Sequence, residues 1–293
     1  MYAIGIDIGG MSAKIGLLLD GVLEKEERIP TGSGLDYDPF VARLCGRVAA
    51  LCGKFPVEKV GISSCGMIDR ARGCISYSNN IQWENKNLTG DVARRVGLPV
   101  KIANDAKCAA LAEAVLGAGK NYSRVCMITL GTGVGGCFIR DKKLDEGNAY
   151  ADADGILGHI TVEAGGRLCT CGRRGCLEAY ASASAVMKTY REKTGISLSA
   201  QEIFQRARAG EEPAGETVEH FRYYLADGLV SLVNVLRPEI IVLGGGMAGS
   251  GEDFIPYLQE AVNTLPYGGA ILPVKIAMAE LGNKAGMIGA ALL

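Results

Sequence analysis

The sequence lacks the features that would direct a chain into a membrane or onto a polyanion. Its 293 residues contain no uncharged apolar run near the ~20 residues that cross a bilayer. The amino terminus has no basic region and reaches an acid at Asp7, so it is not a signal peptide. Lys and Arg number 31 against 32 Asp and Glu, which leaves no excess positive charge for nucleic acid. We expect a cytoplasmic protein that binds neither nucleic acid nor membranes, and any phosphate must be bound by a local site.

Histidine is also scarce, with two residues, whereas cysteine is abundant, with ten. Hydrophobic residues make up 48% and charged residues 22%, which excludes a disordered chain. The length is about twice that of a usual domain of ~100–200 residues and therefore predicts two domains.

One supersecondary pattern occurs twice. Strand 3–8 runs into Gly9-Gly10 and then into a second apolar stretch, 15–19; strand 126–130 runs into the glycine-rich segment 131–136 and then into 137–139. Strands and helices alternate elsewhere: strands at 57–62, 100–103 and 239–243, and helices at 40–52, 106–116, 181–193, 200–209, 216–236 and about 253–263. The pattern predicts two similar α/β domains with a cleft between them. The expected boundaries are 1–116 with a carboxyl-terminal helix at 283–293 for the smaller domain, and 117–282 for the larger domain.

The two glycine turns are candidates for phosphate binding. Each could be a simple hairpin turn, but two of them at the ends of matched strands allow backbone N–H groups to reach phosphate oxygens, with Thr129 and Thr132 as further donors. Neither turn fits the P-loop or the dinucleotide-binding pattern. Asp7 is acidic where a phosphate would bind, which predicts Mg²⁺ with a nucleotide.

Asn104-Asp105 ends one strand and opens a helix. Asp105 is either a helix N-cap or a carboxylate that accepts a proton from an attacking hydroxyl, and the two roles are compatible. Asn79-Asn80, before Trp83, is either a turn or a pair of amides for sugar hydroxyls. The Gly244-Gly245-Gly246 segment is either a plain turn or a place where a nucleoside passes close to the backbone.

The third candidate site is a metal centre. Cys169, Cys171 and Cys176 lie within eight residues, and His159 precedes them by ten. Three thiols and one imidazole form a standard closed zinc set, and the glycines and arginines between the cysteines are typical of a solvated loop rather than a core. His220, in a helical stretch, is interpreted as a surface or packing residue.

Taken together, these motifs resemble the ROK family, and in particular its glucokinase-like sugar kinases. The matching stretches are Asp7-Ile8-Gly9-Gly10, the Asn80 segment, Asn104-Asp105, 129–136, Gly158-His159, the cysteine motif from Cys169 to Glu178, and the Gly244 turn. The resemblance implies a two-domain actin-like ATPase (ribonuclease H-like) fold, Mg-ATP and a sugar as ligands, structural Zn²⁺, and a homodimer.

The resemblance also implies residue roles. Asp105 would be the catalytic base, and the sugar would contact Gly66, Asn80, Asn104, Asp105, His159 and Glu178. The ATP phosphates and nucleoside would contact Asp7, Gly9, Gly10, Ser12, Thr129, Gly131, Thr132, Gly133, Gly244 and Gly245. Zinc would be held by His159, Cys169, Cys171 and Cys176.

Two departures from the family pattern bear on the substrate. Met11 stands where the family usually has Thr, with Ser12 next to it, and Ile156 replaces the glutamate of the E-x-G-H motif that ends at His159. Losing that acceptor disfavours glucose itself.

The leading prediction is an ATP-dependent hexose kinase that phosphorylates a sugar hydroxyl, at C6 in the expected reaction. The alternative is a catalytically silent sugar sensor or regulator of the same family. A transcriptional repressor is not expected, because the first strand begins at residue 3 with no preceding helix-turn-helix segment.

Overall fold

The computed structural model describes residues 1–31, 36–78, 80–144, 156–269 and 271–293. Contacts within the chain divide it into two units. The first unit contains Met1–Lys120, a segment that begins at Lys142, and Asn283–Leu293; the second contains Asn121–Asp141 and Ile156–Gly282. We keep the predicted domains, 1–116 with 283–293 and 117–282, as a hypothesis about which parts fold independently.

The first unit is built on a five-stranded sheet in the order β3-β2-β1-β4-β8. Its strands are β1 (Tyr2–Ile8), β2 (Ser12–Leu19), β3 (Val22–Pro30), β4 (Val57–Ser64) and β8 (Val100–Asn104). β1 is antiparallel to β2 and parallel to β4, so the predicted hairpin is confirmed. A separate three-stranded sheet contains β5 (Met67–Asp69), β6 (Cys74–Ser78) and β7 (Trp83–Lys86).

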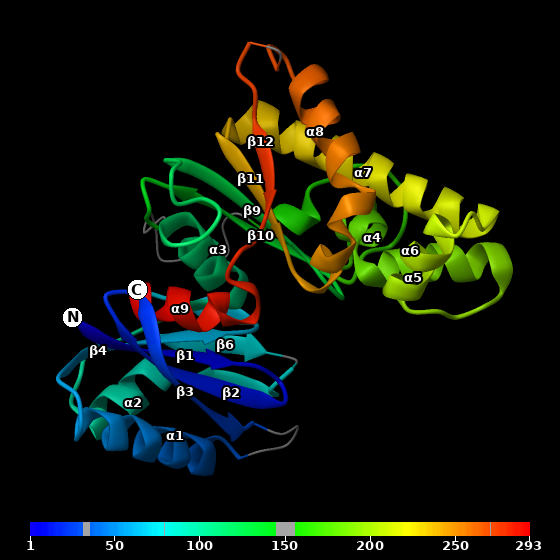
Figure 1. Ribbon diagram of the computed structural model, residues 1–293. Coiled ribbons are helices and arrows are strands. Elements are labelled where there is room, and N and C mark those ends of the chain that lie inside the picture. Colours follow the sequence, from blue (N-terminus) through cyan, green and yellow to red (C-terminus); the bar gives the residue numbers. More distant parts are fainter. Residues whose placement is uncertain (32–35, 79, 145–155, 270) are drawn as a thin grey trace. The chain divides into compact units, whose positions relative to one another are not determined.

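Side-chain alternation along β1 decides which helices cover which face of this sheet. Ile4, Ile6 and Ile8 pack with α1 (Tyr37–Cys52) and α2 (Leu88–Val96) in one apolar core. The opposite face carries Gly5 and Asp7 and meets α9 (Ala285–Leu292), which in turn packs on α3 (Asp105–Val115). Figure 1 shows α9 lying on the sheet beside α3.

Glycine makes the approach of α9 possible. A Cβ at Gly5 would lie 2.0 Å from the Met287 carbonyl oxygen, and one at Gly61 would lie 1.7 Å from the Ala290 carbonyl oxygen. Any side chain at either position would therefore push the last helix off the sheet.

The second unit contains a four-stranded sheet in the order β10-β9-β11-β12. The strands are β9 (Arg124–Leu130), β10 (Val134–Arg140), β11 (Ile240–Gly244) and β12 (Lys275–Met278). β9 is antiparallel to β10 and parallel to β11, so this hairpin is also confirmed and the topology of the first sheet recurs.

Helices of the second unit bury one face of its sheet. Cys126, Ile128 and Leu130 share an apolar core with residues of all five of these helices. The helices are α4 (Glu178–Ala181), α5 (Ala183–Thr194), α6 (Ala200–Arg208), α7 (Glu212–Leu236) and α8 (Ile255–Thr264). The described residues also form the 3₁₀ segments η1 (Leu157–His159), η2 (Gly246–Asp253) and η3 (Gly282–Lys284).

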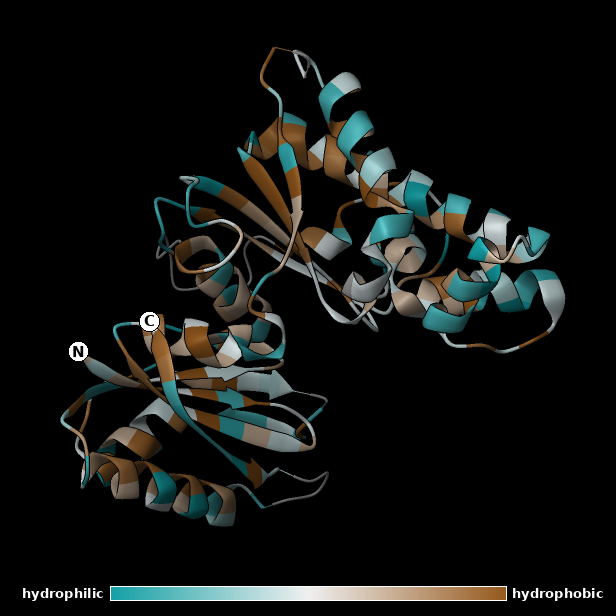
Figure 2. Ribbon diagram, viewed as in Figure 1, coloured by the Kyte–Doolittle hydropathy of each residue, from teal (hydrophilic) through white to brown (hydrophobic). Residues whose placement is uncertain are grey.

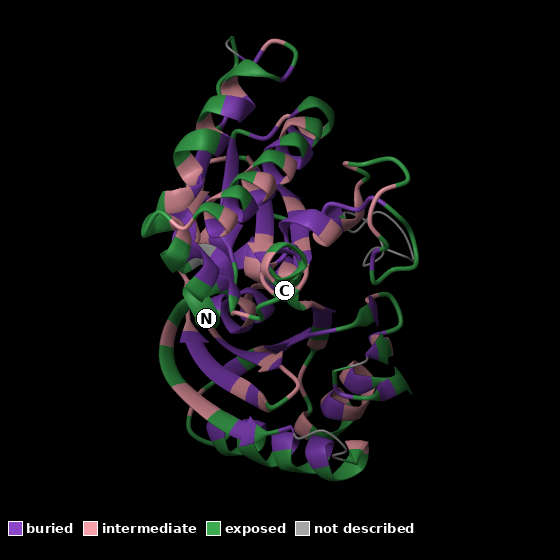
Figure 3. Cartoon of the chain, turned by 90° about the vertical axis from the view of Figure 1, so that its right-hand side faces the viewer, coloured by how far each residue is buried: buried purple, intermediate pink, exposed green. Residues whose placement is uncertain are grey.

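The hydropathy and burial patterns agree with this layering. The central strands of the two larger sheets are mostly hydrophobic, whereas the edge strand β3 is mostly hydrophilic, and α1 and α7 alternate hydrophobic with hydrophilic residues (Figure 2). The same central strands are largely buried, while exposed positions gather on the outer faces of the helices (Figure 3). Among the described residues, no helix combines the length and the apolar character needed to cross a membrane.

Candidate active site and metal centre

Asp7 is held by the first sheet itself. Its Oδ1 accepts a hydrogen bond of 2.8 Å from the Ser63 hydroxyl on β4, and its Oδ2 lies 3.3 Å from the Lys14 ammonium on β2. Both partners are its neighbours in strand register. Each carboxylate oxygen therefore already has a partner from the protein, so a divalent cation would add to these contacts rather than find a bare carboxylate.

The turn after Asp7 is closed by its own backbone. The Gly9 N–H donates to the Ser12 carbonyl at 3.1 Å, and the buried Thr31 hydroxyl donates to the Gly9 carbonyl at 2.6 Å. The Gly9 amide is thus already bonded within the turn, and a phosphate would have to displace this bond or use a different donor. The Met11 side chain is 87% exposed.

Asn104, and not Asp105, is the N-cap of α3. The Asn104 side-chain oxygen accepts from the Ala106 N–H at 3.0 Å, and its amide nitrogen donates to the Gly66 carbonyl at 3.2 Å. The capping role considered for Asp105 is therefore wrong, because helix α3 begins at Asp105 and its cap is the preceding residue. Asp105 is left as a carboxylate in the first turn that accepts from the Ala106 N–H at 2.9 Å.

The environment of Asp105 favours proton uptake. Asp105 is an exposed residue, but surrounding atoms reduce the hydration of its carboxyl group and so raise its pKa; the Ala106 N–H acts against that rise, and the charge on Asp7 adds to it. A carboxylate with a raised pKa is a stronger base than an ordinary Asp.

Gly66 and Asn80 are linked to the residues around this carboxylate. The Gly66 carbonyl accepts from the Asn104 side chain at 3.2 Å. Burial raises the pKa of the Cys65 thiol, which precedes Gly66, and hydrogen bonds with Ser78 and Asn80 act against that rise. A Cβ at Gly10 would lie 3.3 Å from the Asn80 carbonyl oxygen. The first unit thus gathers Asp7, the glycine turn and every sugar residue predicted within it; Asn79 lies outside the described residues.

The second glycine turn is anchored to a helix. The Gly131 N–H donates to the Gly133 carbonyl at 3.0 Å, and the Gly131 carbonyl accepts from the Ala183 N–H at 2.8 Å. Thr132 is exposed and Thr129 is half-buried. Gly244 pairs with Thr129 across the sheet, and Gly245, at φ +92°, lies against Leu130, where a Cβ would be 2.4 Å from its carbonyl oxygen. The predicted phosphate and nucleoside residues of this unit therefore lie at this turn or directly beside it.

Glu178 connects this turn to the cysteine loop. Its Oε2 accepts from the Val134 N–H at 3.1 Å, and its Oε1 accepts from the Thr170 hydroxyl at 2.6 Å. Each carboxylate oxygen has two lone pairs, so a sugar hydroxyl could still donate to it.

The four predicted metal ligands converge. The ligand atoms of His159, Cys169, Cys171 and Cys176 all lie within 4.8 Å of one another. His159 Nδ1 is 3.6 Å from the Cys169 sulfur, and the Cys171 and Cys176 sulfurs are 3.6 Å apart. Zn–S bonds of about 2.3 Å and Zn–N bonds of about 2.0 Å give tetrahedral edges of about 3.5–3.8 Å, so the set fits such an ion.

Electrostatics of the cysteines also favour a cation. Burial raises the pKa of Cys176 to about 12, and the sulfurs of Cys171 and Cys169 act in the same direction. Three thiolates would repel one another here, and a divalent cation removes that repulsion.

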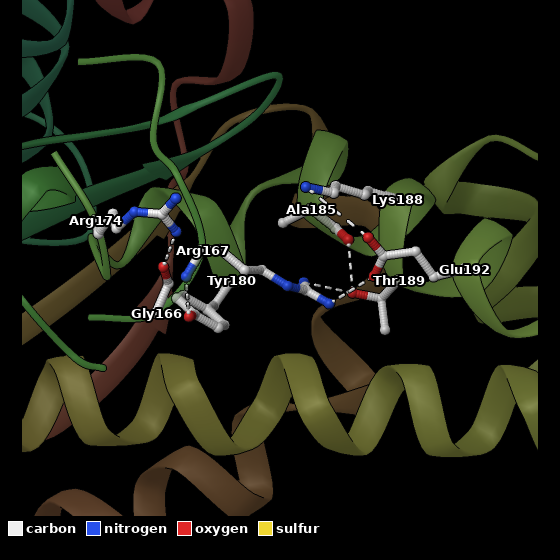
Figure 4. Close-up of polar contacts among 8 residues, drawn as sticks. All are labelled: Gly166, Arg167, Arg174, Tyr180, Ala185, Lys188, Thr189 and Glu192. Carbon is white, nitrogen blue, oxygen red and sulfur yellow. Dashed lines mark hydrogen bonds and ion pairs between the residues drawn. The ribbon is translucent and has the colours of Figure 1, made fainter. Parts of the chain in front are cut away.

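Arginine and tyrosine side chains fasten the cysteine loop to its unit (Figure 4). The Arg167 N–H donates to the Tyr180 hydroxyl at 2.7 Å, and its guanidinium donates to Thr189 at 2.8 Å and pairs with Glu192 at 2.9 Å. Tyr180 also lies 5.9 Å from the ring of His220, so the packing role predicted for His220 is confirmed.

Sequence reasoning missed Lys14, Ser63 and Thr31. Only strand register brings the first two to Asp7. The signal in the sequence is a lysine inside an otherwise mostly apolar strand.

Comparison with known proteins supports the fold and the family. A family model described as the ROK family matches residues 3–293. A glucokinase of Thermotoga maritima is 32% identical over 304 residues, which cover 98% of this chain and 95% of that protein. An N-acetylgalactosamine kinase of Shewanella sp. is 33% identical over 302 residues, covering 99% of this chain and 95% of that protein.

A solved structure agrees with these matches. The crystal structure of a ROK family glucokinase from Streptomyces griseus in complex with glucose and AMPPNP superimposes with a TM-score of 0.79 at 31% identity, covering 99% of this chain and 98% of that one. The fold is therefore the α/β actin-like ATPase fold, as predicted. The chain belongs to the ROK family.

Proposed function

We propose that the protein transfers the γ-phosphoryl group of Mg-ATP to the 6-hydroxyl group of a hexose. Its relatives over nearly the whole chain are sugar kinases, which supports a sugar kinase here as well. The observation that carries the proposal is the place of Asp105 in the first turn of α3, with a raised pKa and directly after Asn104, which caps the helix and holds the Gly66 carbonyl.

Asp105 is the catalytic base in this proposal. Its carboxylate takes the proton of the sugar hydroxyl as that oxygen attacks the γ-phosphorus, and ADP leaves. Asn104 has two roles, since it caps α3 and holds the Gly66 carbonyl, and both contacts fix the start of the helix that carries Asp105.

The remaining predicted residues are assigned to the ligands. We assign the sugar to Gly66, Asn80, Asn104 and Asp105 in the first unit and to His159 and Glu178 in the second. We assign the phosphates to Asp7, Gly9, Gly10 and Ser12 and to Thr129, Gly131, Thr132 and Gly133, and the nucleoside to Gly244 and Gly245.

The metal ions have different roles. Mg²⁺ would be held near Asp7 and would neutralise charge on the transferring phosphoryl group. Zn²⁺ would be held by His159, Cys169, Cys171 and Cys176 and would order the loop that carries the Glu178 contact with Thr170. Homodimer formation and a cytoplasmic location stay predictions.

Ile156 is the residue we assign to sugar selection. It is 49% exposed and directly precedes the 3₁₀ segment that contains His159. An isoleucine offers apolar surface and no acceptor, so the preferred sugar is altered near C1 or C2, as in a 2-acetamido sugar, a ketose or a glycoside.

A panel of hexoses, N-acetylhexosamines, ketoses and β-glucosides, assayed for ADP release with Mg-ATP, tests this proposal. We expect turnover with a modified sugar, poor kcat/KM with glucose, and a shift towards glucose on Ile156→Glu. No turnover with any sugar would favour the silent sensor, and a wild type that prefers glucose would remove Ile156 from sugar selection.

A further inference from the structure

Lys14 is a charged residue in a strand that is otherwise mostly apolar. Its ammonium lies 3.3 Å from Asp7 Oδ2 and donates to the Asn283 carbonyl at 2.8 Å. The Lys14 and Asp7 side chains are each 20% exposed. Partly buried charges are screened by salt much less than exposed ones, so this pair affects its surroundings more than a surface pair does.

The pair lies directly before the first glycine turn. Asp7 is two residues from Gly9, and a bare carboxylate at this place would repel any phosphate bound by the turn. The Lys14 ammonium, 3.3 Å from one carboxylate oxygen, offsets that charge, and the Ser63 hydroxyl donates to the second oxygen at 2.8 Å.

The Lys14 ammonium also reaches the start of the last helix. Asn283 is the residue at which the chain re-enters the first unit, just before α9. A Cβ at Gly286, in the first turn of α9, would lie 2.9 Å from Asp7 Oδ1. Lys14, on the strand after the turn, therefore contacts both the Asp7 carboxylate and the residue that precedes α9.

We propose that Lys14 is a positioning residue for nucleotide binding, which neutralises Asp7 and fixes it so that anionic phosphates can approach the Gly9-Gly10 turn. The inference rests on the proposed function, because it takes the nucleotide to bind at this turn. It adds a residue that no motif singled out and a measurable consequence: Lys14 is needed most when the phosphates arrive without a metal ion.

The test compares ATP binding with and without Mg²⁺. Calorimetric titration of the full-length protein gives the Kd of Mg-ATP and the Kd of ATP in the presence of EDTA. Lys14→Met exposes the charge of Asp7, so free ATP should lose about tenfold more affinity than Mg-ATP, whose metal ion screens the phosphates. Lys14→Arg keeps the charge and should keep the ratio of the two Kd values near that of wild type.

Two further variants separate charge from general damage. Lys25→Met removes a lysine from an exposed pair with Glu27 on β3, at 2.9 Å, and should leave both Kd values unchanged. Adding Asp7→Asn to Lys14→Met removes the exposed charge and should bring the Kd of free ATP, measured in EDTA, back towards wild type.

The outcomes are distinct. An equal loss for both forms of ATP, or no recovery in the double variant, would overturn the positioning role while leaving the kinase proposal standing. If wild type binds neither form of ATP, the proposed function and this inference both fail.

Discussion

The two hairpins of the molecule share a topology and differ in chemistry. In both sheets the first strand of an antiparallel hairpin pairs along its other edge with a parallel strand. Aligned by their strands, the two sheets place Thr129 where the first has Asp7, Gly135 where it has Lys14, and Gly244 where it has Ser63. The ion pair and serine hydroxyl of the first unit are therefore replaced by one threonine hydroxyl and two glycines in the second.

The supports of the two turns differ as well. In the first unit Thr31, on the chain just after β3, donates to the Gly9 carbonyl. In the second unit the support comes from Glu178, whose other oxygen contacts the cysteine loop. The same backbone topology therefore carries a charged turn supported by a nearby residue in the first unit and a neutral turn supported through the cysteine loop in the second.

The largest expected effect is that of a substitution in the first unit. Asp105→Asn should lower kcat by about 10²–10⁴-fold and leave the Kd of Mg-ATP nearly unchanged, because only proton transfer is lost. The raised pKa means that the ionised carboxyl group costs the folded state free energy above that pKa, so the variant should have an equal or higher Tm. Turnover within a few-fold of wild type would rule out Asp105 as the base.

Metal removal should weaken sugar binding through the second unit. Protein purified without chelator should contain about one Zn²⁺ per chain, measured by elemental analysis. Cys176→Ser should release it and raise the sugar KM by about 10–100-fold, the loss typical of disturbed support around a metal site, while the Kd of Mg-ATP changes less. Cys126→Ser, a buried thiol outside the cluster, is the matched control. Zinc-free wild-type protein with full sugar affinity would refute the metal centre.

A matched pair of glycine variants compares the turns directly. A Cβ at Gly133 would lie 2.4 Å from Glu178 Oε2, whereas one at Gly10 would lie 3.3 Å from the Asn80 carbonyl oxygen. Gly133→Ala should displace Glu178 and raise the sugar KM by about 5–50-fold, since overpacking costs ~1–3 kcal/mol. Gly10→Ala should change the sugar KM less than threefold, because its new Cβ would make the looser contact. Steady-state kinetics with the preferred sugar decides, and equal effects would mean that Glu178 does not position the sugar.

The smallest effect is a shift in pH dependence. Asp105 must be ionised to act as a base, so kcat/KM should fall as the pH drops through its raised pKa. Asp7→Asn removes one cause of that raised pKa, so the acid limb of the profile should move to lower pH by less than one unit. A limb that does not move would show that Asp7 and Asp105 are not electrostatically coupled.

The sequence predicts the two hairpins and most long helices because their apolar periods are clear and glycines mark the turns. It misses β5, β6 and β7, which have only three to five residues each and carry polar residues such as Asp69 and Glu84. β12 is missed for the same reason, with four residues. Such short strands are stabilised by their neighbours and not by a pattern of their own.

The candidate site shows the same limit. The convergence of the four candidate metal ligands could be predicted because three of them share one short segment. The capping role of Asn104 could not be predicted, because the start of a helix is uncertain by a residue or two from sequence alone. The partners of Asp7 could not be predicted either, because strand register brings together residues that are far apart in the chain.

The seating of α9 on Gly5 and Gly61 has a consequence for biosynthesis. The sheet of the first unit is translated early, yet residues 285–292, which cover one of its faces, are translated last. Until then the backbone around these glycines has no helix against it, whereas the segments of the second unit are already synthesised. On the ribosome, the half that begins first should therefore finish folding last, so its early strands are the part of the nascent chain most in need of a chaperone.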